Sequence, residues 1–548
     1  MYGQKLKTLI SSFFLIPLFI VSCTNIKTNN SGKVAFHYNE SKSITSLDPA
    51  FAKTQTNIWP THQIFNGLVQ IDSSLNIIPA IAKYWTVTDS GHTYLFVLRN
   101  DVYFHPSSLF GKDSTRKVTA QDFVYSFGRL LDEKVASPGS WIFAQVDQSK
   151  GEKGFQAIDD TIFAIYLKKP FPGLIGLLTT VYCSVVPKEV VEHYGKDFRN
   201  HPIGTGPFKF AMWKEGEKLV LLRNPNYFET DTKGHKLPYI DAIDITFVAD
   251  KQSEFLEFMQ GRLDMISGIT ASNKDELLTS QGTLKAVYKQ KIKMYKQKYL
   301  NLEYLGFNLD SNAIGSLSIL RNKYIRKAIN YGFDRKKMMR YLRNNIGCPA
   351  NYGFIPYGMP NYDTRHTKGY SYNPIKALEM LEKAGYPNGE NLPEIELSTT
   401  SDYLDLCEFI QHDLSKIGVS IKINVLNGPT FRSFVSEGKT QMFRASWIAD
   451  YPDPENYFSL FYSKNFSPTG PNYTHFHSQV YDSLYNTLFA NISDSVRQVI
   501  YYKLDSIIIE DAAVVPLYYD EVVDFLQKDI KGFVVNPMNM LELKYIRK

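Results

Sequence analysis

The sequence has little cysteine and no long hydrophobic run after its first residues. Only 4 of its 548 residues are cysteine, and none are spaced as a CxxC pair, so a structural zinc site is not expected. Beyond residue 22, no segment reaches the roughly 18 apolar residues that a membrane-spanning helix needs. No long basic run is present, so a nucleic-acid-binding surface is not indicated. Cys183, Cys348 and Cys407 can form at most one disulfide, and their spacing does not identify which pair.

Motifs of common enzymes are also missing. The sequence contains no HExxH, no GxSxG, no P-loop and no EF-hand loop. Residues 204–207 contain a GxG, but Pro207 lacks the N–H group that a phosphate would need, so a tight turn is favoured. His475 and His477 would share one face of a strand, which makes a metal site conceivable. No acid or cysteine flanks them closely, and a polar surface strand is the preferred interpretation. We therefore expect no enzyme activity, no cofactor and no metal site.

The composition indicates a large globular protein. Hydrophobic residues make up 44% and charged residues 21%, and 548 residues predict two or three core regions. Aromatic residues are frequent at 14%, with 36 Tyr and 36 Phe. They favour large cores, and an aromatic-lined cleft is the alternative.

The N-terminus has the features of an export signal. Lys5 and Lys7 precede a mostly apolar stretch at 9–21, which is too short to span a bilayer comfortably. It ends in Ile-Val-Ser-Cys at 20–23, which resembles a bacterial lipobox. We expect residues 1–22 to be a lipoprotein signal peptide, Cys23 to be lipidated, and residues 24–32 to form a flexible tether. Removal of the two lysines lowers the formal net charge from +6 to +4.

Helical and strand periodicities alternate along the chain. Thr119 and Asp122 form a capping-box pattern before an apolar helical face. Asn373 and Pro374 predict a helix start, which Gly385 closes. Further segments with clear patterns are a helix at 404–417 and strands at 161–167, 242–248 and 419–425. The mixed order predicts an α/β fold.

Several blocks together resemble a known family of transport proteins. They include GHTYLFVLRNDVYFH (91–105), GTGPFKF (204–210), IRKAINYGFDRKKM (325–338) and RASWIADYPDPENYF (444–458). In this order, they are similar to the oligopeptide- and dipeptide-binding proteins of ABC importers, over roughly residues 38–546. By resemblance, the fold is a two-lobed periplasmic-binding-protein type II fold with an extra domain inserted in the first lobe. The implied parts are lobe I (24–68, 186–290 and 515–548), the inserted domain (69–185) and lobe II (291–514).

The resemblance implies a binding protein for peptides. Asp450 matches the position of the acid that binds the peptide α-amine, and Arg444 matches a cation that can meet the peptide carboxylate. Trp447 matches an aromatic residue that packs on a ligand side chain, and Tyr451 beside Asp450 belongs to the same expected site. Three of them have a structural alternative, because Asp450 could cap a turn, Arg444 could form a scaffold ion pair, and Trp447 could belong to the core.

The expected partners follow from the same resemblance. A peptide ligand would be captured in the cleft, and the closed protein would dock on ABC permease subunits in the membrane, with a separate ATPase supplying energy. We expect an extracytoplasmic monomer, lipid-anchored to a bacterial membrane and facing the periplasm or the cell surface. The alternatives are binding of a non-peptide solute, such as a sugar or metal chelate, and a ligand sensor on the same fold.

Overall fold

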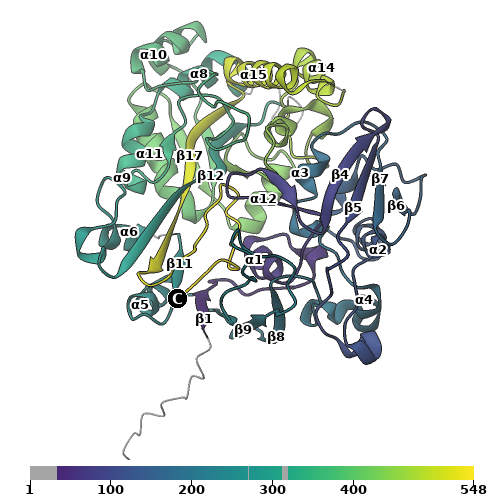
Figure 1. Ribbon diagram of the computed structural model, residues 1–548. Coiled ribbons are helices and arrows are strands. Elements are labelled where there is room, and N and C mark those ends of the chain that lie inside the picture. The colour runs from purple at the N-terminus through teal and green to yellow at the C-terminus, as the bar shows by residue number, and fades with distance from the viewer. Residues whose placement is uncertain (1–33, 269–270, 311–318, 491) are drawn as a thin grey trace, which may run out of the picture. The chain divides into compact units, whose positions relative to one another are not determined.

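Two long strands form the centre of the main sheet in the computed structural model. The structure describes residues 34–268, 271–310, 319–490 and 492–548. The predicted signal peptide, Cys23 and the tether therefore lie outside the described residues. Strands β12 (Ile292–Phe307) and β17 (Val514–Gln527) pair antiparallel along most of their length and run together through the middle of Figure 1.

The main sheet has 11 strands in the described part of the chain, and β12 and β17 connect its two halves. The order is β15-β14-β16-β12-β17-β11-β1-β10-β9-β8, and β13 also pairs with β17. The bounds of one half are β13 Cys348–Pro349, β14 Ile395–Thr399, β15 Ile421–Val425 and β16 Met442–Ile448. Those of the other half are β1 Ala35–Asn39, β8 Phe208–Lys214, β9 Lys218–Arg223, β10 Ala242–Thr246 and β11 Met265–Ser267.

The pairing of β12 with β17 changes register where the chain passes between these halves. Ile292 to Lys298 pair with Gln527 to Glu521, beside β11, whereas Leu302 to Gly306 pair with Tyr519 to Val514, beside β16. Register shifts lie between Lys298 and Leu302 and between Glu303 and Tyr304. A bulge bends and twists a strand locally, so the two strands can bend where they pass from one half to the other. The predicted limit at 290/291 lies just before β12, and the limit at 514/515 lies after the first residue of β17; both stay predictions.

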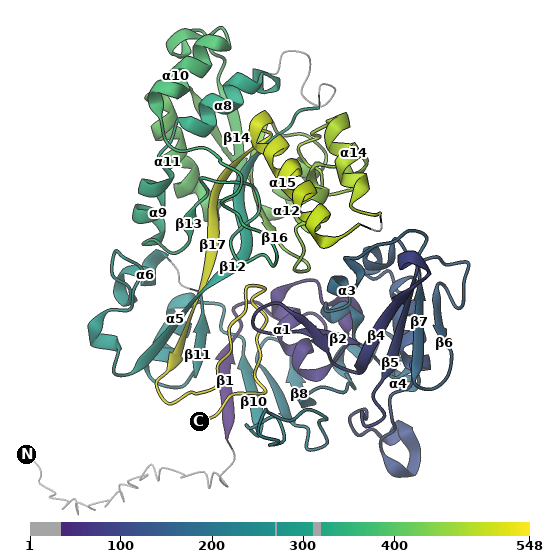
Figure 2. The same cartoon turned by 45° about the horizontal axis from the view of Figure 1, so that its top comes forward.

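Helices cover the half that contains β14 to β16, as Figure 2 shows. α8 (Lys323–Tyr331), α9 (Arg335–Arg343), α10 (Pro374–Lys383) and α11 (Leu404–Ser415) share a hydrophobic core with β12, β14 and β17. The other α-helices of the described residues are α1 Gln55–Ile64, α2 Ala120–Leu130, α3 Leu174–Leu177, α4 Lys188–Tyr194, α5 Lys251–Met259, α6 Ala271–Leu277, α12 Gly428–Ser436, α13 Glu455–Phe458, α14 Gln479–Thr487 and α15 Asp494–Asp511. No helix among the described residues has the length and apolarity that crossing a membrane requires.

A second sheet is built from residues 82–166, which follow α1 in the chain. It has four strands in the order β4-β5-β7-β6, with bounds Ala82–Thr88, Thr93–Leu98, Ile162–Tyr166 and Phe155–Ala157. A small hairpin, β2 (Val69–Ile71) with β3 (Ile77–Pro79), precedes it. Phenylalanines from α2 and from β5 to β7 pack on one another to form its core, which accounts for part of the aromatic content. We call residues 80–183, which contain this sheet, the small-sheet segment.

Several elements predicted from local sequence signals are confirmed. The capping box of Thr119 and Asp122 opens α2, and the Asn373 side chain caps α10, which has Pro374 at its first position. The strands predicted at 161–167, 242–248 and 419–425 are β7, β10 and β15. The predicted surface strand at His475 and His477 is wrong. His475 has a φ of +51° and lies in a loop, where its ring stacks on Phe466 and contacts Asp310 and Ser467.

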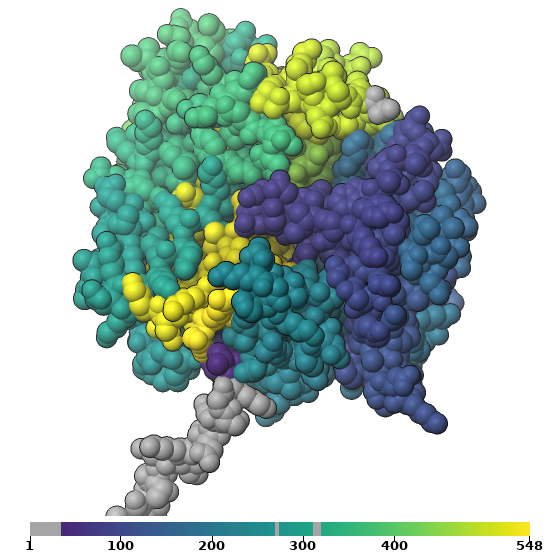
Figure 3. Space-filling view, in the orientation of Figure 1, coloured from purple at the N-terminus to yellow at the C-terminus, as the bar shows by residue number. Residues whose placement is uncertain are grey.

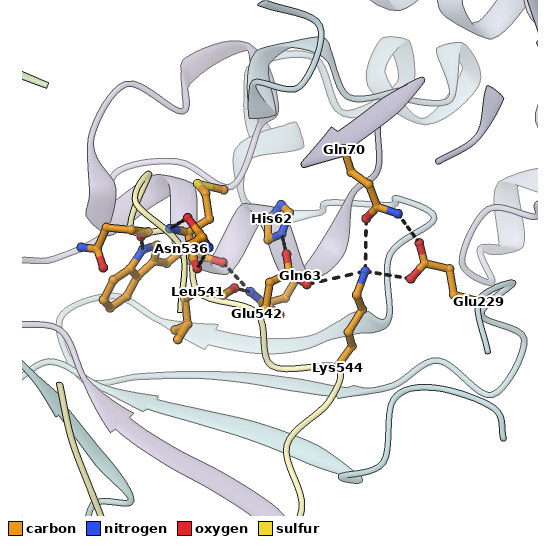
Figure 4. A network of polar contacts seen from close by, with 11 residues as sticks. His62, Gln63, Gln70, Glu229, Asn536, Leu541, Glu542 and Lys544 are labelled. Carbon is orange, nitrogen blue, oxygen red and sulfur yellow. Dashed lines mark hydrogen bonds and ion pairs between the residues drawn. The ribbon is translucent and has the colours of Figure 1, made fainter. Parts of the chain in front are cut away.

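The C-terminal segment is fixed against α1 by a buried polar network (Figure 4). The Lys544 ammonium lies 2.7 Å from Glu229 and 3.5 Å from Glu542, and Gln63 donates to the Leu541 carbonyl oxygen. Burial alone would raise the pKa of Glu542, but the charges of Lys544 and His62 outweigh it and lower this pKa to about 2. The yellow C-terminal segment reaches the surface between purple and teal segments in Figure 3. These pairs hold the segment in place after β17 ends.

Candidate functional site

A pocket of about 990 Å³ lies between the small-sheet segment and the turn that follows β16. This volume is at the upper end of the range for small-molecule sites. We call it the main pocket. From the small-sheet segment it is lined by Trp141, Gln145, Lys169, Phe171 and Leu177. From residues 447–490 it is lined by Trp447, Asp450, Tyr451, Glu455, Lys464 and Tyr485, among others.

Strand alternation on β16 separates two of the residues predicted to bind the ligand. Side chains three positions apart in a strand point to opposite faces of the sheet, so Arg444 and Trp447 cannot line the same surface. Trp447 lines the main pocket, and Arg444 does not. Arg444 is buried and its Nη2 lies 2.5 Å from an oxygen of Glu303 on β12, with its guanidinium over the Tyr403 ring. These are the contacts of the scaffold ion pair that the sequence left open.

Asn456 orients both Trp447 and Asp450. Its Oδ1 accepts from the Trp447 indole N–H at 2.9 Å and from the backbone N–H of Asp450 at 3.2 Å. Its Nδ2 donates to the Asp450 Oδ2 at 3.2 Å. No donor among the described residues contacts the other Asp450 oxygen, which leaves it able to accept from a ligand. Sequence reasoning missed Asn456, although it lies in the same block as Asp450.

Asp450 is exposed to solvent in the pocket, but protein atoms lie close around its carboxylate. Its surface is exposed, yet the neighbouring protein desolvates it and raises its pKa, and the hydrogen bond from Asn456 opposes this rise. An acid in such a place gains from a cationic partner, because pairing offsets the cost of its partial desolvation.

Tyr451 joins the turn after β16 to the small-sheet segment. The residue is only 3% exposed and belongs to the same hydrophobic core as Leu174 and Leu177. A Cβ atom at Gly176 would come within 3.3 Å of the Tyr451 ring, so the glycine allows the ring to pack closely on α3. Tyr451 therefore lines the pocket as part of its wall.

The buried carboxyl group of Glu455 lies beside Tyr451 in the wall of the pocket. The hydroxyls of Tyr451 and Tyr485 donate to the two oxygens of Glu455, one to each. Burial raises the pKa of Glu455 to about 7, and these two hydrogen bonds oppose the rise. Asp453 raises it further, and Arg497 lowers it. No sequence signal distinguished Glu455 from the other acids of this block.

Metal and disulfide chemistry find little support in the described residues. Cys183, Cys348 and Cys407 are all free thiols. Within the described ranges, no group of three or more His, Cys, Asp or Glu is arranged to hold a metal ion. His477 is exposed and His475 is used in the contacts given above, so the pair is not brought together as a metal site.

Comparison with known proteins identifies the family. Residues 76–468 match the model of the bacterial extracellular solute-binding proteins, family 5, middle region. The chain therefore belongs to this family of solute-binding proteins. This family supports the interpretation of the chain as a binding protein rather than an enzyme.

Individual relatives match along almost the whole chain. The heme-binding protein A of Haemophilus influenzae is 26% identical over 94% of this chain and 92% of its own length. The dipeptide-binding protein DppE of Bacillus subtilis is 24% identical over 95% and 93%. The structure of DppA from Helicobacter pylori in complex with the peptide STSA superposes with a TM-score of 0.76 at 24% identity, covering 94% and 98%. The predicted two-lobed α/β fold is thereby confirmed.

The raised pKa of Glu455 predicts a distinct pH dependence of the free energy of unfolding. Its pKa is about 7 in the folded protein against an ordinary 4.5, so its contribution to stability is complete below about pH 4.5 and is lost as the pH rises through 7. We expect wild type to lose on the order of 3 kcal/mol relative to Glu455→Gln over this range, since one pKa unit corresponds to about 1.4 kcal/mol. Urea unfolding from about pH 4 to about pH 8 measures this difference.

The exposed Glu382 on α10 provides the control for this experiment. Glu382→Gln should keep the pH profile of wild type. If the free energies of unfolding of wild type and Glu455→Gln change in parallel with pH, Glu455 has the same pKa in the folded and the unfolded protein.

Proposed function

We propose that this chain captures short peptides in the main pocket and delivers them to the permease subunits of an ABC importer. The observation that carries the proposal is the Asp450 carboxylate, which lies in the pocket with one oxygen that no donor of the described residues contacts. A binder that ignores side chains must recognise what all peptides share, and the α-ammonium is the most distinctive such group. A carboxylate is its natural partner in a partly desolvated site.

The edge of β16 also favours a peptide as the ligand. β16 pairs with β12 from Ile448 to Met442, but β14 pairs with β16 only at Met442 and Phe443. The backbone between Arg444 and Ile448 thus has one side without a strand partner among the described residues. An extended peptide can add as a strand to such an edge, which satisfies its own backbone groups. Its N-terminus would then lie near Asp450 and a side chain near Trp447.

The donor set of the pocket favours a peptide over a heme, the ligand named for one relative. The pocket lining contains no histidine, cysteine or methionine in the part of the chain that is described. Its tyrosines all donate their hydroxyls to other side chains, Tyr451 and Tyr485 to Glu455 and Tyr462 to Asn486. Axial heme ligands come from these residue types, so none is free for that role. The relatives named for dipeptides and for a bound peptide agree with the peptide proposal.

The proposed setting is outside the cytoplasm, with Cys23 lipidated. One acyl chain binds membranes only marginally, whereas two or more anchor stably. The family of extracellular solute-binding proteins and the lipobox-like sequence before Cys23 support this setting. The ligand-bound protein would dock on the permease subunits, and a separate ATPase would supply the energy for transport.

The role of Asp450 is tested by a cycle of two changes. Truncating one partner of a buried charge pair costs about 2–5 kcal/mol, so Asp450→Asn should weaken binding of a free peptide by roughly 30- to 4,000-fold. N-acetylation of the peptide should weaken wild-type binding similarly and should change binding to Asp450→Asn little. Calorimetry on all four combinations measures the coupling.

Asp159→Asn is the matched control, because Asp159 is exposed and lies outside the main pocket. It should bind like wild type. Additive losses in the cycle would mean that Asp450 and the amine do not meet. Equal binding of the free and acetylated peptides by wild type would favour a non-peptide solute.

The lipid anchor is tested by the change Cys23→Ala in the full-length protein. The variant should leave the membrane fraction, because it lacks the attachment point for the acyl chains. Fractionation after a salt wash, followed by immunoblotting, measures the distribution. A variant that stays with the membrane after the wash would refute lipidation at Cys23.

A further inference from the structure

The main pocket contains more positive charge than a neutral peptide needs. Lys169 and Lys464 both line it, and both are exposed. Lys169 lies between β7 and α3 of the small-sheet segment, and Lys464 lies in the short turn Ser463–Asn465 of the facing wall. Neither forms an ion pair with any described residue of the chain. Two lysines with no ion-pair partner among the described residues thus line the pocket, one from each wall.

The acids of the pocket do not neutralise these lysines. Glu455 uses both oxygens as acceptors for tyrosine hydroxyls, which leaves it poorly placed to bind a further cation. Asp450 is the remaining acid in the lining, and it is the proposed partner of the peptide ammonium. When that ammonium is bound, both lysines still lack a counter-charge.

The carboxylate partner expected from the sequence is also absent from the pocket. Arg444 is paired with Glu303 on the other face of β16. A peptide carboxylate in the main pocket must therefore find another cation, and the lysines are the two that line it. One lysine can pair with the C-terminal carboxylate of a peptide, and the other lysine can then pair with a second carboxylate of the ligand.

We infer that the pocket selects short acidic peptides, which carry one ammonium and two carboxylates, with Asp450 binding the ammonium and Lys169 and Lys464 binding the carboxylates. This inference rests on the proposed function and specifies its ligand class. The two lysines come from opposite walls, so a ligand that pairs with both also links the walls. Closure of the pocket around such a ligand desolvates the pairs, which strengthens them relative to exposed ion pairs.

The test compares two peptides that differ only in one charge. Calorimetry with Ala-Glu-Ala and Ala-Gln-Ala, and with the corresponding peptides of two to five residues, measures the preference for the acidic side chain. Wild type should prefer the Glu peptide by roughly tenfold or more, which corresponds to about 1.4 kcal/mol. One of the variants Lys169→Met and Lys464→Met should abolish this preference. The other should weaken the binding of both peptides to a similar extent.

Lys168→Met is the matched control, since Lys168 is the exposed neighbour of Lys169 and does not line the pocket. It should keep the full preference. Equal binding of the two peptides by wild type, or a preference that both lysine variants retain, would overturn the inference while leaving peptide binding intact. If neither peptide binds at any length, the proposed function itself fails, and the inference fails with it.

Discussion

The pairing of β12 with β17 is the constraint on which the rest of the structure depends. In the sheet order of the described residues, these two strands lie between β16 and β11 and link one half of the sheet to the other. Their register changes between Lys298 and Leu302, where the neighbours change from β11 to β16. A sheet that is continuous but locally irregular can hold two halves in register and still bend, which a binding protein with two lobes requires.

The candidate site is built where one half meets the small-sheet segment. Tyr451 packs into the core of that segment against α3, while its hydroxyl donates to Glu455 on its own side. Asn456 meanwhile holds Trp447 and Asp450 at the pocket surface. Packing therefore positions the wall, and polar contacts position the groups that can meet a ligand. Asp450, Lys169 and Lys464, which have no ion-pair partner among the described residues, give the pocket its chemical character.

The sequence predicted local structure well because its signals act over a few residues. The capping box at Thr119 and the Asn-Pro start at 373–374 each define a helix end by hydrogen bonds within one turn. The alternation along β16 could also have shown that Arg444 and Trp447 face opposite ways. The ion pair of Arg444 with Glu303, the hydrogen bond from Tyr485 to Glu455, and the placement of Lys169 and Asp450 around one pocket join distant segments. No local pattern encodes such contacts, which only the tertiary fold brings together.

The most direct test of peptide capture is to identify what the protein carries. The protein, purified without added ligand and then denatured, should release short peptides with free N-termini, detected by mass spectrometry of the small molecules in the supernatant. The same treatment of Asp450→Asn should release far less. Stoichiometric release of a sugar, a heme or another non-peptide solute from wild type would contradict the account.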